Sequence, residues 1–131
     1  MHVNIEKVAG KTASDAKFSI VIPSWNNLAY LQLCIESIKK HSTYTHQIIV
    51  HINEGVDGTL DWVKSQPDIS YSYSKENIGV CYALNSCRTL VTTNYLLYIA
   101  NCLTSVPLMR LFFLLGTCDV GTVLVKRIES Q

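Results

Sequence analysis

The sequence predicts an α/β domain, three-layer α/β/α with a mainly parallel sheet. Between Phe18 and Ile99, four short apolar or β-branched runs alternate with helical patterns, and each run ends in turn-forming residues. The composition agrees, because 48% of the 131 residues are hydrophobic and 16% are charged, as expected for a chain with a packed core. This length fits one ordinary domain.

The first predicted strand, Phe18–Pro23, is an apolar, β-branched run that a proline ends. A strand covered on both faces does not need to alternate apolar and polar residues. Asn26 or Asn27 can then cap a helix from Leu28 to about His41. The apolar stripe of that helix repeats at i, i+3, i+4 and i+7 and consists of Leu31, Cys34, Ile35 and Ile38.

The second strand is expected at Gln47–Ile52, and turn residues then lead to a short helix, Thr59–Lys64, capped by its threonine. Ile69–Ser74 alternates apolar residues with serines, which is typical of a one-sided strand at the edge of a sheet. Apolar spacing predicts a helix over Val80–Val91, and Tyr95–Ile99 is the fourth strand.

The bulk features exclude several classes of protein. The net charge of +1 argues against a basic nucleic-acid surface. No apolar run approaches the ~18 residues of a membrane-spanning helix, and residues 1–17, a flexible leader, lack a secretory pattern. Five cysteines without a C-x-x-C pair favour reduced thiols and a cytoplasmic location. His41, His46 and His51 lack zinc-motif spacing, and surface or capping roles are expected for them.

A ligand site is expected at the carboxyl ends of the four strands, because ligands of parallel α/β sheets bind there. Four loops follow these strand ends, at Ser24–Asn27, Asn53–Gly58, Lys75–Gly79 and Ala100–Ser105.

Taken in order, these strands and loops resemble the start of the glycosyltransferase family 2 catalytic domain, which has the GT-A (nucleotide-diphospho-sugar transferase-like) fold. The resemblance covers Phe18 to about Ile99. It rests on Ser19–Asn26, on Ile48–Val50 with Asn53 and Asp57-Gly58-Thr59, on Asn77-Ile78-Gly79 with Asn85, and on Tyr95–Ile99. It implies a sheet whose first strand is central, with the second and fourth on its two sides and the third beyond the second.

The resemblance also implies a nucleotide-sugar site on the first three loops, for a UDP- or GDP-type donor. Its residues would be Pro23, Ser24, Trp25, Asn26, Asn53, Glu54, Asp57, Asn77, Gly79 and Asn85.

Individual roles within that set differ. Trp25 would stack on the base, or it simply covers the core. Asn53 and Glu54 could hydrogen-bond the base or the ribose. Asp57 is expected to build the turn and cap the helix. Asn77 and Gly79 would let the backbone approach the nucleotide, and Asn85 could reach the diphosphate or simply be exposed.

The sequence departs from the family pattern at three points. The aspartate usual at the end of the second strand falls on Ile52, and the arginine before the Asn85 position is Leu84. Family members hold Mn or Mg with an Asp-x-Asp motif after the fourth strand, through hard carboxylate ligands. Here Ile99 is followed by Ala100-Asn101-Cys102, and no acidic residue lies between Asn77 and Cys118. The sequence after the fourth strand therefore lacks the carboxylate ligands of the expected metal.

We expect a leader at 1–17, a nucleotide-sugar-binding half at 18–99 and a divergent tail at 100–131, truncated relative to a whole domain. Such a domain would transfer a sugar from a nucleotide-sugar to an acceptor hydroxyl, but this chain alone is expected to show no transfer. The alternative is a non-catalytic nucleotide-binding or interaction module with a doubly wound α/β fold. In the tail, a helix over Pro107–Leu115 presents a stripe that could mediate self-association, and Val120–Val125 reads as a strand. The stripe consists of Leu108, Leu111, Phe112 and Leu115.

Overall fold

The computed structural model describes residues 3–99 and 123–127. Its elements are, in chain order, β1 (Ile5–Val8), β2 (Phe18–Trp25), α1 (Leu28–His41), β3 (His46–Asn53), α2 (Thr59–Lys64), β4 (Ile69–Ser74), α3 (Gly79–Cys87), the 3-10 turn η1 (Arg88–Leu90), β5 (Tyr95–Ile99) and β6 (Val123–Arg127). The segments expected at Ala100–Ser105 and Pro107–Leu115 lie outside the described residues. None of the described helices is long and apolar enough to cross a membrane.

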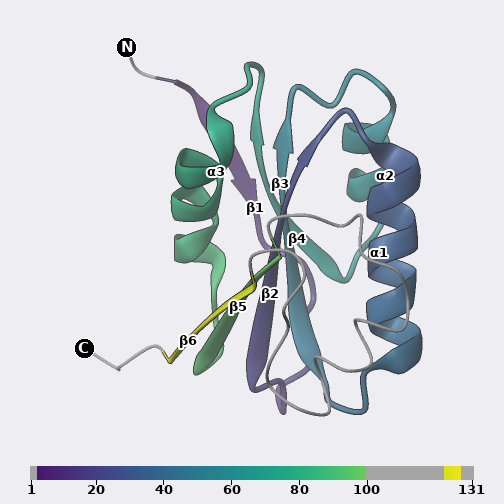
Figure 1. Cartoon of the computed structure of the whole chain (residues 1–131), viewed down its shortest axis with the longest axis vertical. Helices are drawn as coiled ribbons and strands as arrows, with labels where there is room; N and C mark the ends of the chain where they lie inside the picture. Colours follow the sequence, from purple (N-terminus) through teal and green to yellow (C-terminus); the bar gives the residue numbers. More distant parts are fainter. Residues whose placement is uncertain (1–2, 100–122, 128–131) are drawn as a thin grey trace.

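The described strands form one sheet in the order β1-β4-β3-β2-β5-β6 (Figure 1). The four central strands are parallel, whereas β1 and β6 pair antiparallel at the two edges. The first predicted strand, now β2, lies between the second and the fourth, and the third lies beyond the second. The sheet order expected of a GT-A half is therefore confirmed.

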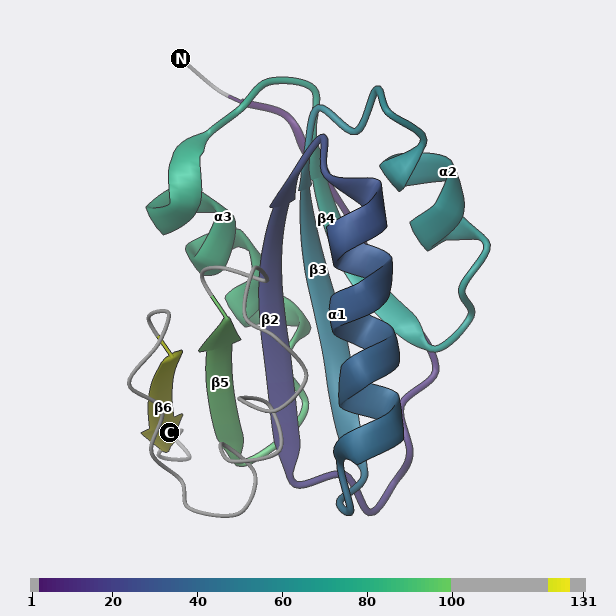
Figure 2. The ribbon, with the colours of Figure 1, turned by 45° about the vertical axis from the view of Figure 1, so that its right-hand side comes forward.

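The sheet is covered on both faces, which confirms the three-layer arrangement. Helices α1 and α2 lie on one face and α3 on the other, and α1 runs alongside β2 and β3 (Figures 1 and 2). On the α1 face, the predicted stripe of the helix is buried against side chains of β2 and β3, among them Ile20, Ile22 and Val50. On the α3 face, a smaller apolar cluster joins Val21, Ile49, Cys87 and Leu96.

Strand β1 corrects the expectation of a flexible leader for Ile5–Val8. This strand pairs antiparallel with β4, from Ile5 opposite Ser74 to Val8 opposite Tyr71. Three of its four residues are exposed, so the sequence carries no buried periodicity there. What the strand gains is a set of backbone hydrogen bonds along β4.

The same pairing corrects the prediction that Ile69–Ser74 is an edge strand with one buried face. Strand β4 lies between β1 and β3, and its serines are buried as well as its apolar residues. A buried serine needs hydrogen-bond partners, and Ser72 finds one on the neighbouring strand, where its Oγ lies 2.6 Å from Nδ1 of His51.

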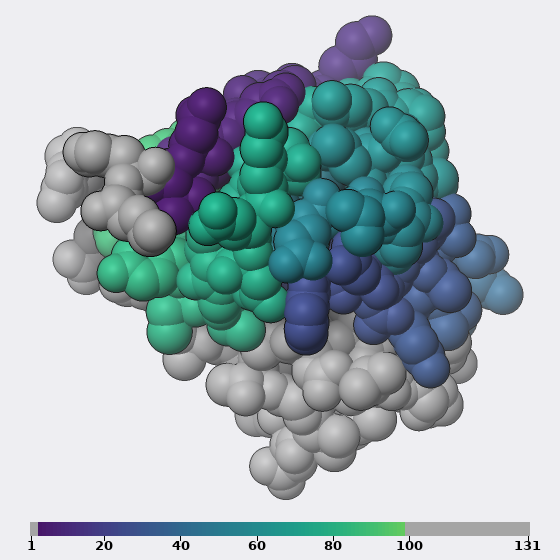
Figure 3. Space-filling view, turned by 90° about the horizontal axis from the view of Figure 1, so that it is seen from above, coloured from purple at the N-terminus to yellow at the C-terminus, as the bar shows by residue number. Residues whose placement is uncertain are grey.

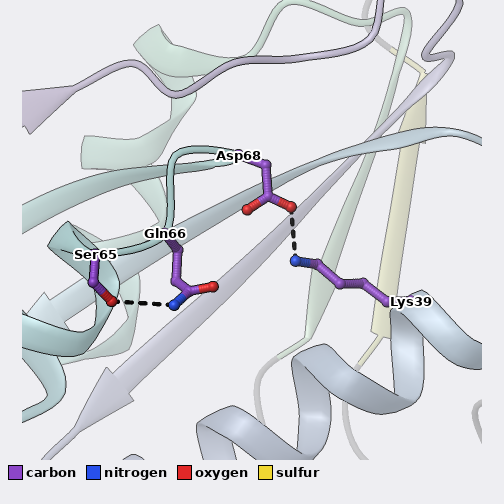
Figure 4. Close-up of polar contacts among 4 residues, drawn as sticks. All are labelled: Lys39, Ser65, Gln66 and Asp68. Carbon is purple, nitrogen blue, oxygen red and sulfur yellow. Dashed lines mark hydrogen bonds and ion pairs between the residues drawn. The ribbon is translucent and has the colours of Figure 1, made fainter.

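Figure 4 shows two polar contacts in the layer formed by α1 and α2. Lys39 Nζ in the last turn of α1 lies 2.7 Å from Asp68 Oδ2, in the turn that precedes β4. After α2, the side-chain amide of Gln66 donates to Ser65 Oγ over 3.1 Å. Both contacts are exposed, and the Lys39–Asp68 pair lies at the opposite end of the sheet from the predicted ligand loops.

Candidate functional site

The carboxyl ends of β2, β3 and β4 lie at one edge of the sheet, which Figure 3 views from above. Strands β2 and β3 extend to Trp25 and Asn53, slightly further than predicted. Both strands therefore carry polar or aromatic side chains directly at the edge. The loops after them lie side by side with the loop that follows β4 (Figure 3).

Glu54 joins the first two loops. Its Oε2 accepts a hydrogen bond from the indole Nε1 of Trp25 over 3.1 Å and another from Asn26 Nδ2 over 2.9 Å. The carbonyl oxygen of the Asn26 side chain in turn accepts from the backbone N–H of Val56 over 3.0 Å. The carboxylate and the amide thus form a clamp, defined here as Trp25, Asn26 and Glu54.

The backbone of this clamp is strained. Asn26 has φ 43° and Glu54 has φ 63°, and these are the described non-glycine residues with positive φ. This left-handed region is unfavourable for side chains other than glycine, although asparagine tolerates it. Residues held there cluster at functional sites, because the surrounding contacts must maintain the conformation. Here the hydrogen bonds of the clamp maintain it.

Trp25 is 59% exposed. The indole therefore does not cover the core, which was one of the two roles that the sequence left open for it. One edge of the ring is held by Glu54, so the ring is positioned and still accessible to a flat ligand. Stacking on a base stays a prediction.

Asn53 joins the second loop to the third. Its side chain is buried, and its Oδ1 accepts from the backbone N–H of Ile78 over 2.9 Å. Beyond Ile78, the N–H of Gly79 donates to Asn77 Oδ1 over 2.9 Å, and Gly79 has φ 74°. A Cβ at Gly79 would meet nothing within 4 Å, so its conformation and not crowding requires glycine. The Asn53 carbonyl is thus used to fix the loop.

Asp57 caps α1, which corrects the prediction that Asn26 or Asn27 does so. Asn27 makes no side-chain cap hydrogen bond, whereas Asp57 Oδ2 accepts from the first helical N–H, that of Leu28, over 2.8 Å. Asp57 Oδ1 accepts from the N–H and the hydroxyl of Thr59, over 3.2 and 2.6 Å. The partial burial of Asp57 would raise the pKa of its carboxyl, but these hydrogen bonds outweigh it and lower the pKa.

The remaining predicted residues are not part of the clamp. Pro23 is half-buried on β2, and Ser24 is buried, its Oγ without a hydrogen-bond partner among the described residues. Asn85 is exposed on α3. Ile52, at the position of the family's aspartate, is fully buried against the α1 layer and offers no polar contact.

Sequence reasoning missed His51. The prediction of a surface or capping role is wrong, because this side chain is completely buried between the sheet and α3. Burial lowers the pKa of His51 to about 4, although a hydrogen bond with Asn53 opposes the shift. A signal was present in the sequence, since His51 and Asn53 alternate along β3 just as the serines alternate along the neighbouring β4.

The described residues do not supply a metal site. Among them, no group of three or more His, Cys, Asp or Glu side chains could hold an ion. Ala100-Asn101-Cys102, which follows β5 in place of an acidic motif, lies outside the described part of the chain. Its residue types do not fit a hard divalent cation, which prefers carboxylate oxygens.

The family model "Glycosyl transferase family 2" matches residues 19–101. The chain belongs to this family. The match begins and ends within two residues of the resemblance traced from the sequence, 18–99, and it includes the loops of β2, β3 and β4. None of the curated proteins compared with the chain matches it.

Among the solved structures, this family 2 chain is similar to the mannosyltransferase PcManGT from Pyrobaculum calidifontis, described as a complex with GDP-Man and Mn2+. The TM-score is 0.57 and the sequence identity is 19%. The likeness covers 71% of this chain and 29% of that one, so the chain spans less than a third of its length. It confirms the fold, which is that of part of a GT-A domain.

Proposed function

We propose that residues 18–99 bind the nucleoside diphosphate part of a nucleotide-sugar, as the donor-binding half of a glycosyltransferase domain. The observation that carries the proposal is the clamp. It holds an accessible indole in place, at the carboxyl edge of the sheet, in a chain of glycosyltransferase family 2. Ligands of open α/β sheets bind at that edge.

The groups at this edge suit the parts of such a ligand. The exposed face of Trp25 offers a stacking surface for a base, and base–aromatic stacking contributes roughly 1–3 kcal/mol. The carboxylate of Glu54 beside it can accept from base or ribose. Helix α3 begins at Gly79, at the same edge, and has no acidic residue in its first turn. A helix N-terminus of this kind favours an anionic diphosphate.

The donor is proposed to be a UDP- or GDP-sugar. In the full reaction of such a domain, the bond between the sugar C1 and the diphosphate oxygen breaks. A bond from C1 to the acceptor oxygen forms, a base takes the proton of the acceptor hydroxyl, and the nucleoside diphosphate leaves with the electron pair. The 131-residue chain by itself is proposed to bind without transferring, because positions 100–118, which follow β5 directly, carry no carboxylate. A non-catalytic nucleotide-binding module is the second candidate. The lack of a carboxylate directly after β5 favours it as well. A cytoplasmic location and self-association through Leu108–Leu115 stay predictions.

The fluorescence of Trp25 can report binding, because the chain has only one other tryptophan, Trp62. Trp62→Phe leaves Trp25 as the sole indole, and Trp62 packs against the core on α2. Titrating this variant with UDP, GDP and their mannose and glucose conjugates, with and without Mn2+, should quench its fluorescence. The same titration of Trp25→Phe should leave the fluorescence of Trp62 unchanged.

Calorimetry then separates stacking from general effects. Trp25→Ala should weaken binding roughly tenfold, as expected for the loss of one stacked base. Tyr44→Ala is the matched control, since Tyr44 is 58% exposed but precedes β3 at the opposite edge, and its affinity should equal that of the parent. Folded protein that binds no nucleoside diphosphate at millimolar concentration would refute the proposal. Release of UDP or GDP above a heat-killed control would refute the absence of transfer.

A further inference from the structure

We propose that His51 is a positioning residue for the nucleotide site: its neutral imidazole orients Asn53, and through Asn53 it fixes the loop between β4 and α3. The inference rests on the proposed function, because it assigns this loop to the nucleotide. His51 is completely buried, two residues before the end of β3, and would contact no ligand itself.

The imidazole lies between three elements. On β4, Ser72 Oγ is 2.6 Å from His51 Nδ1, and on α3, Ser86 Oγ is 3.0 Å from the same nitrogen. The other ring nitrogen, Nε2, is 3.2 Å from Asn53 Oδ1 and 3.2 Å from Ser74 Oγ. Both nitrogens thus have partners, although the ring is completely buried. Satisfied buried polar groups of this kind specify one arrangement.

These partners determine where the proton of the ring lies. Asn53 Oδ1 accepts from the N–H of Ile78 and is therefore an acceptor, so His51 Nε2 must carry the hydrogen that it donates to this oxygen. The unprotonated Nδ1 then accepts. Ser86 donates to the carbonyl of Ala83 over 2.7 Å, which leaves Ser72 as the donor to Nδ1. His51 is thus a donor at Nε2 and an acceptor at Nδ1.

The network leads from the α3 side of the sheet to the ligand loop. The donor at Nε2 holds the Asn53 side chain, Asn53 holds the N–H of Ile78, and Ile78 precedes Gly79, where α3 begins. Without this donor, Asn53 would lose a partner that orients its amide. An apolar side chain such as Ile49 fills the preceding position on the same face of β3 without reaching the loop. The imidazole is therefore suited to positioning as well as to packing.

The experiment compares three variants in the Trp62→Phe background. His51→Leu removes both ring nitrogens, and His51→Gln keeps an N–H donor close to the place of Nε2. Ile38→Ala, in the core on the opposite face of the sheet, is the control for a general loss of stability. GDP and UDP are the probes, titrated by Trp25 fluorescence, and hydrogen exchange of the Ile78 amide is the second readout.

His51→Leu should weaken binding roughly fivefold, the effect of one lost hydrogen bond, and should speed Ile78 exchange beyond the change in global stability. His51→Gln should restore most of the affinity and most of the exchange protection of Ile78. Ile38→Ala should lower the melting temperature without altering the affinity per folded molecule or speeding Ile78 exchange beyond the change in global stability. If His51→Leu binds as tightly as the parent, per folded molecule, His51 has a structural role only and the proposal is wrong.

A measurement without variants tests the same idea. Nitrogen-15 chemical shifts of the His51 ring at pH 7 should show a protonated Nε2 and an unprotonated Nδ1, and the opposite tautomer would overturn the proposal. If the parent binds no nucleotide, the proposed function fails. The tautomer and the exchange of Ile78 then still decide whether His51 fixes the loop.

Discussion

The two faces of the sheet differ in the polarity of their buried side chains. The face under α1 and α2 is a continuous apolar core, in which β2, β3 and β4 contribute isoleucine, valine and tyrosine side chains. The face under α3 has a small apolar cluster with buried polar side chains on both sides of it. Apolar packing is insensitive to direction, whereas hydrogen bonds need defined orientations. The first face is therefore suited to stability and the second to positioning.

The polar side chains of the α3 face form two groups. Toward the amino ends of the strands, Gln47 accepts from Ser19 over 2.7 Å and donates to the carbonyl of Leu90 over 2.8 Å, which fixes the segment before β5. Toward the carboxyl ends, His51 and Asn53 fix the loop before α3. Each group attaches a connecting segment to the sheet, and the α1 face contains no comparable network among the described hydrogen bonds.

The largest expected effect comes from the apolar face. Ile38 on α1 is completely buried, and Ile38→Ala would leave a cavity in the continuous core. We expect the free energy of unfolding to fall by roughly 2–5 kcal/mol, measured by urea denaturation. Nucleotide affinity per folded molecule should stay unchanged. Ile38 lies near the C-terminal end of α1, whereas the loops contact the first residue of this helix, Leu28.

Leu33→Ala on the same helix is the control for this prediction. Leu33 is 55% exposed, so its truncation should change the free energy of unfolding by less than about 0.5 kcal/mol. Equal losses for both variants would contradict the assignment of stability to the buried face of α1.

The second prediction concerns the polar face and pH. The pKa of His51 is lowered to about 4 in the folded chain, while the unfolded value is 6.5. The unfolded chain therefore binds more protons between these values, and stability falls as the pH decreases from 6.5 to 4. Above pH 6.5 the contribution is complete. The expected loss is about 3 kcal/mol, and denaturation at a series of pH values measures it.

His51→Gln separates this effect from other groups. The pKa of His46 is also lowered, mainly by burial, so part of the loss at low pH belongs to that side chain. His46 is present in both proteins, and the difference between parent and variant therefore reports His51. A difference that does not change with pH would show that His51 has the same pKa in both states.

Much of the fold follows from local pattern. The stripe of Leu31, Cys34, Ile35 and Ile38 predicts α1 with its observed ends, and the alternation of strands and helices predicts a parallel sheet. The family resemblance adds the strand order. Because parallel strands present their carboxyl ends at one edge, the position of the candidate site follows as well.

The rest depends on tertiary contacts that local pattern does not encode. Strand β1 exists because β4 offers an edge to pair with, and Ile5–Val8 alone has no distinctive periodicity. His51 is buried because serines from β4 and α3 meet its ring. Asp57 caps α1 from 29 residues away in the chain, a contact that nearest-neighbour rules assign to Asn26 or Asn27.

The smallest expected change in the free energy of unfolding concerns the two ends of helix α1. At the ligand edge, Asp57→Ala would remove the acceptor for Leu28 and for Thr59 together. The loss of a capping side chain costs about 1 kcal/mol. Because the pKa of Asp57 is lowered, the contribution is complete above its unfolded value of 3.8 and is lost as the pH falls through the lower folded value.

Lys39→Ala is the matched control at the opposite edge. Lys39 and Asp68 form an ion pair whose side chains are 44% and 48% exposed. Solvent screens such a pair, so its removal should change the free energy of unfolding by no more than about 0.5 kcal/mol, and added salt should reduce even that. If Lys39→Ala is as costly as Asp57→Ala, charge alone would explain both contacts. If Asp57→Ala is the more costly, and Asp57→Asn recovers part of the loss, directed hydrogen bonds stabilise the ligand edge.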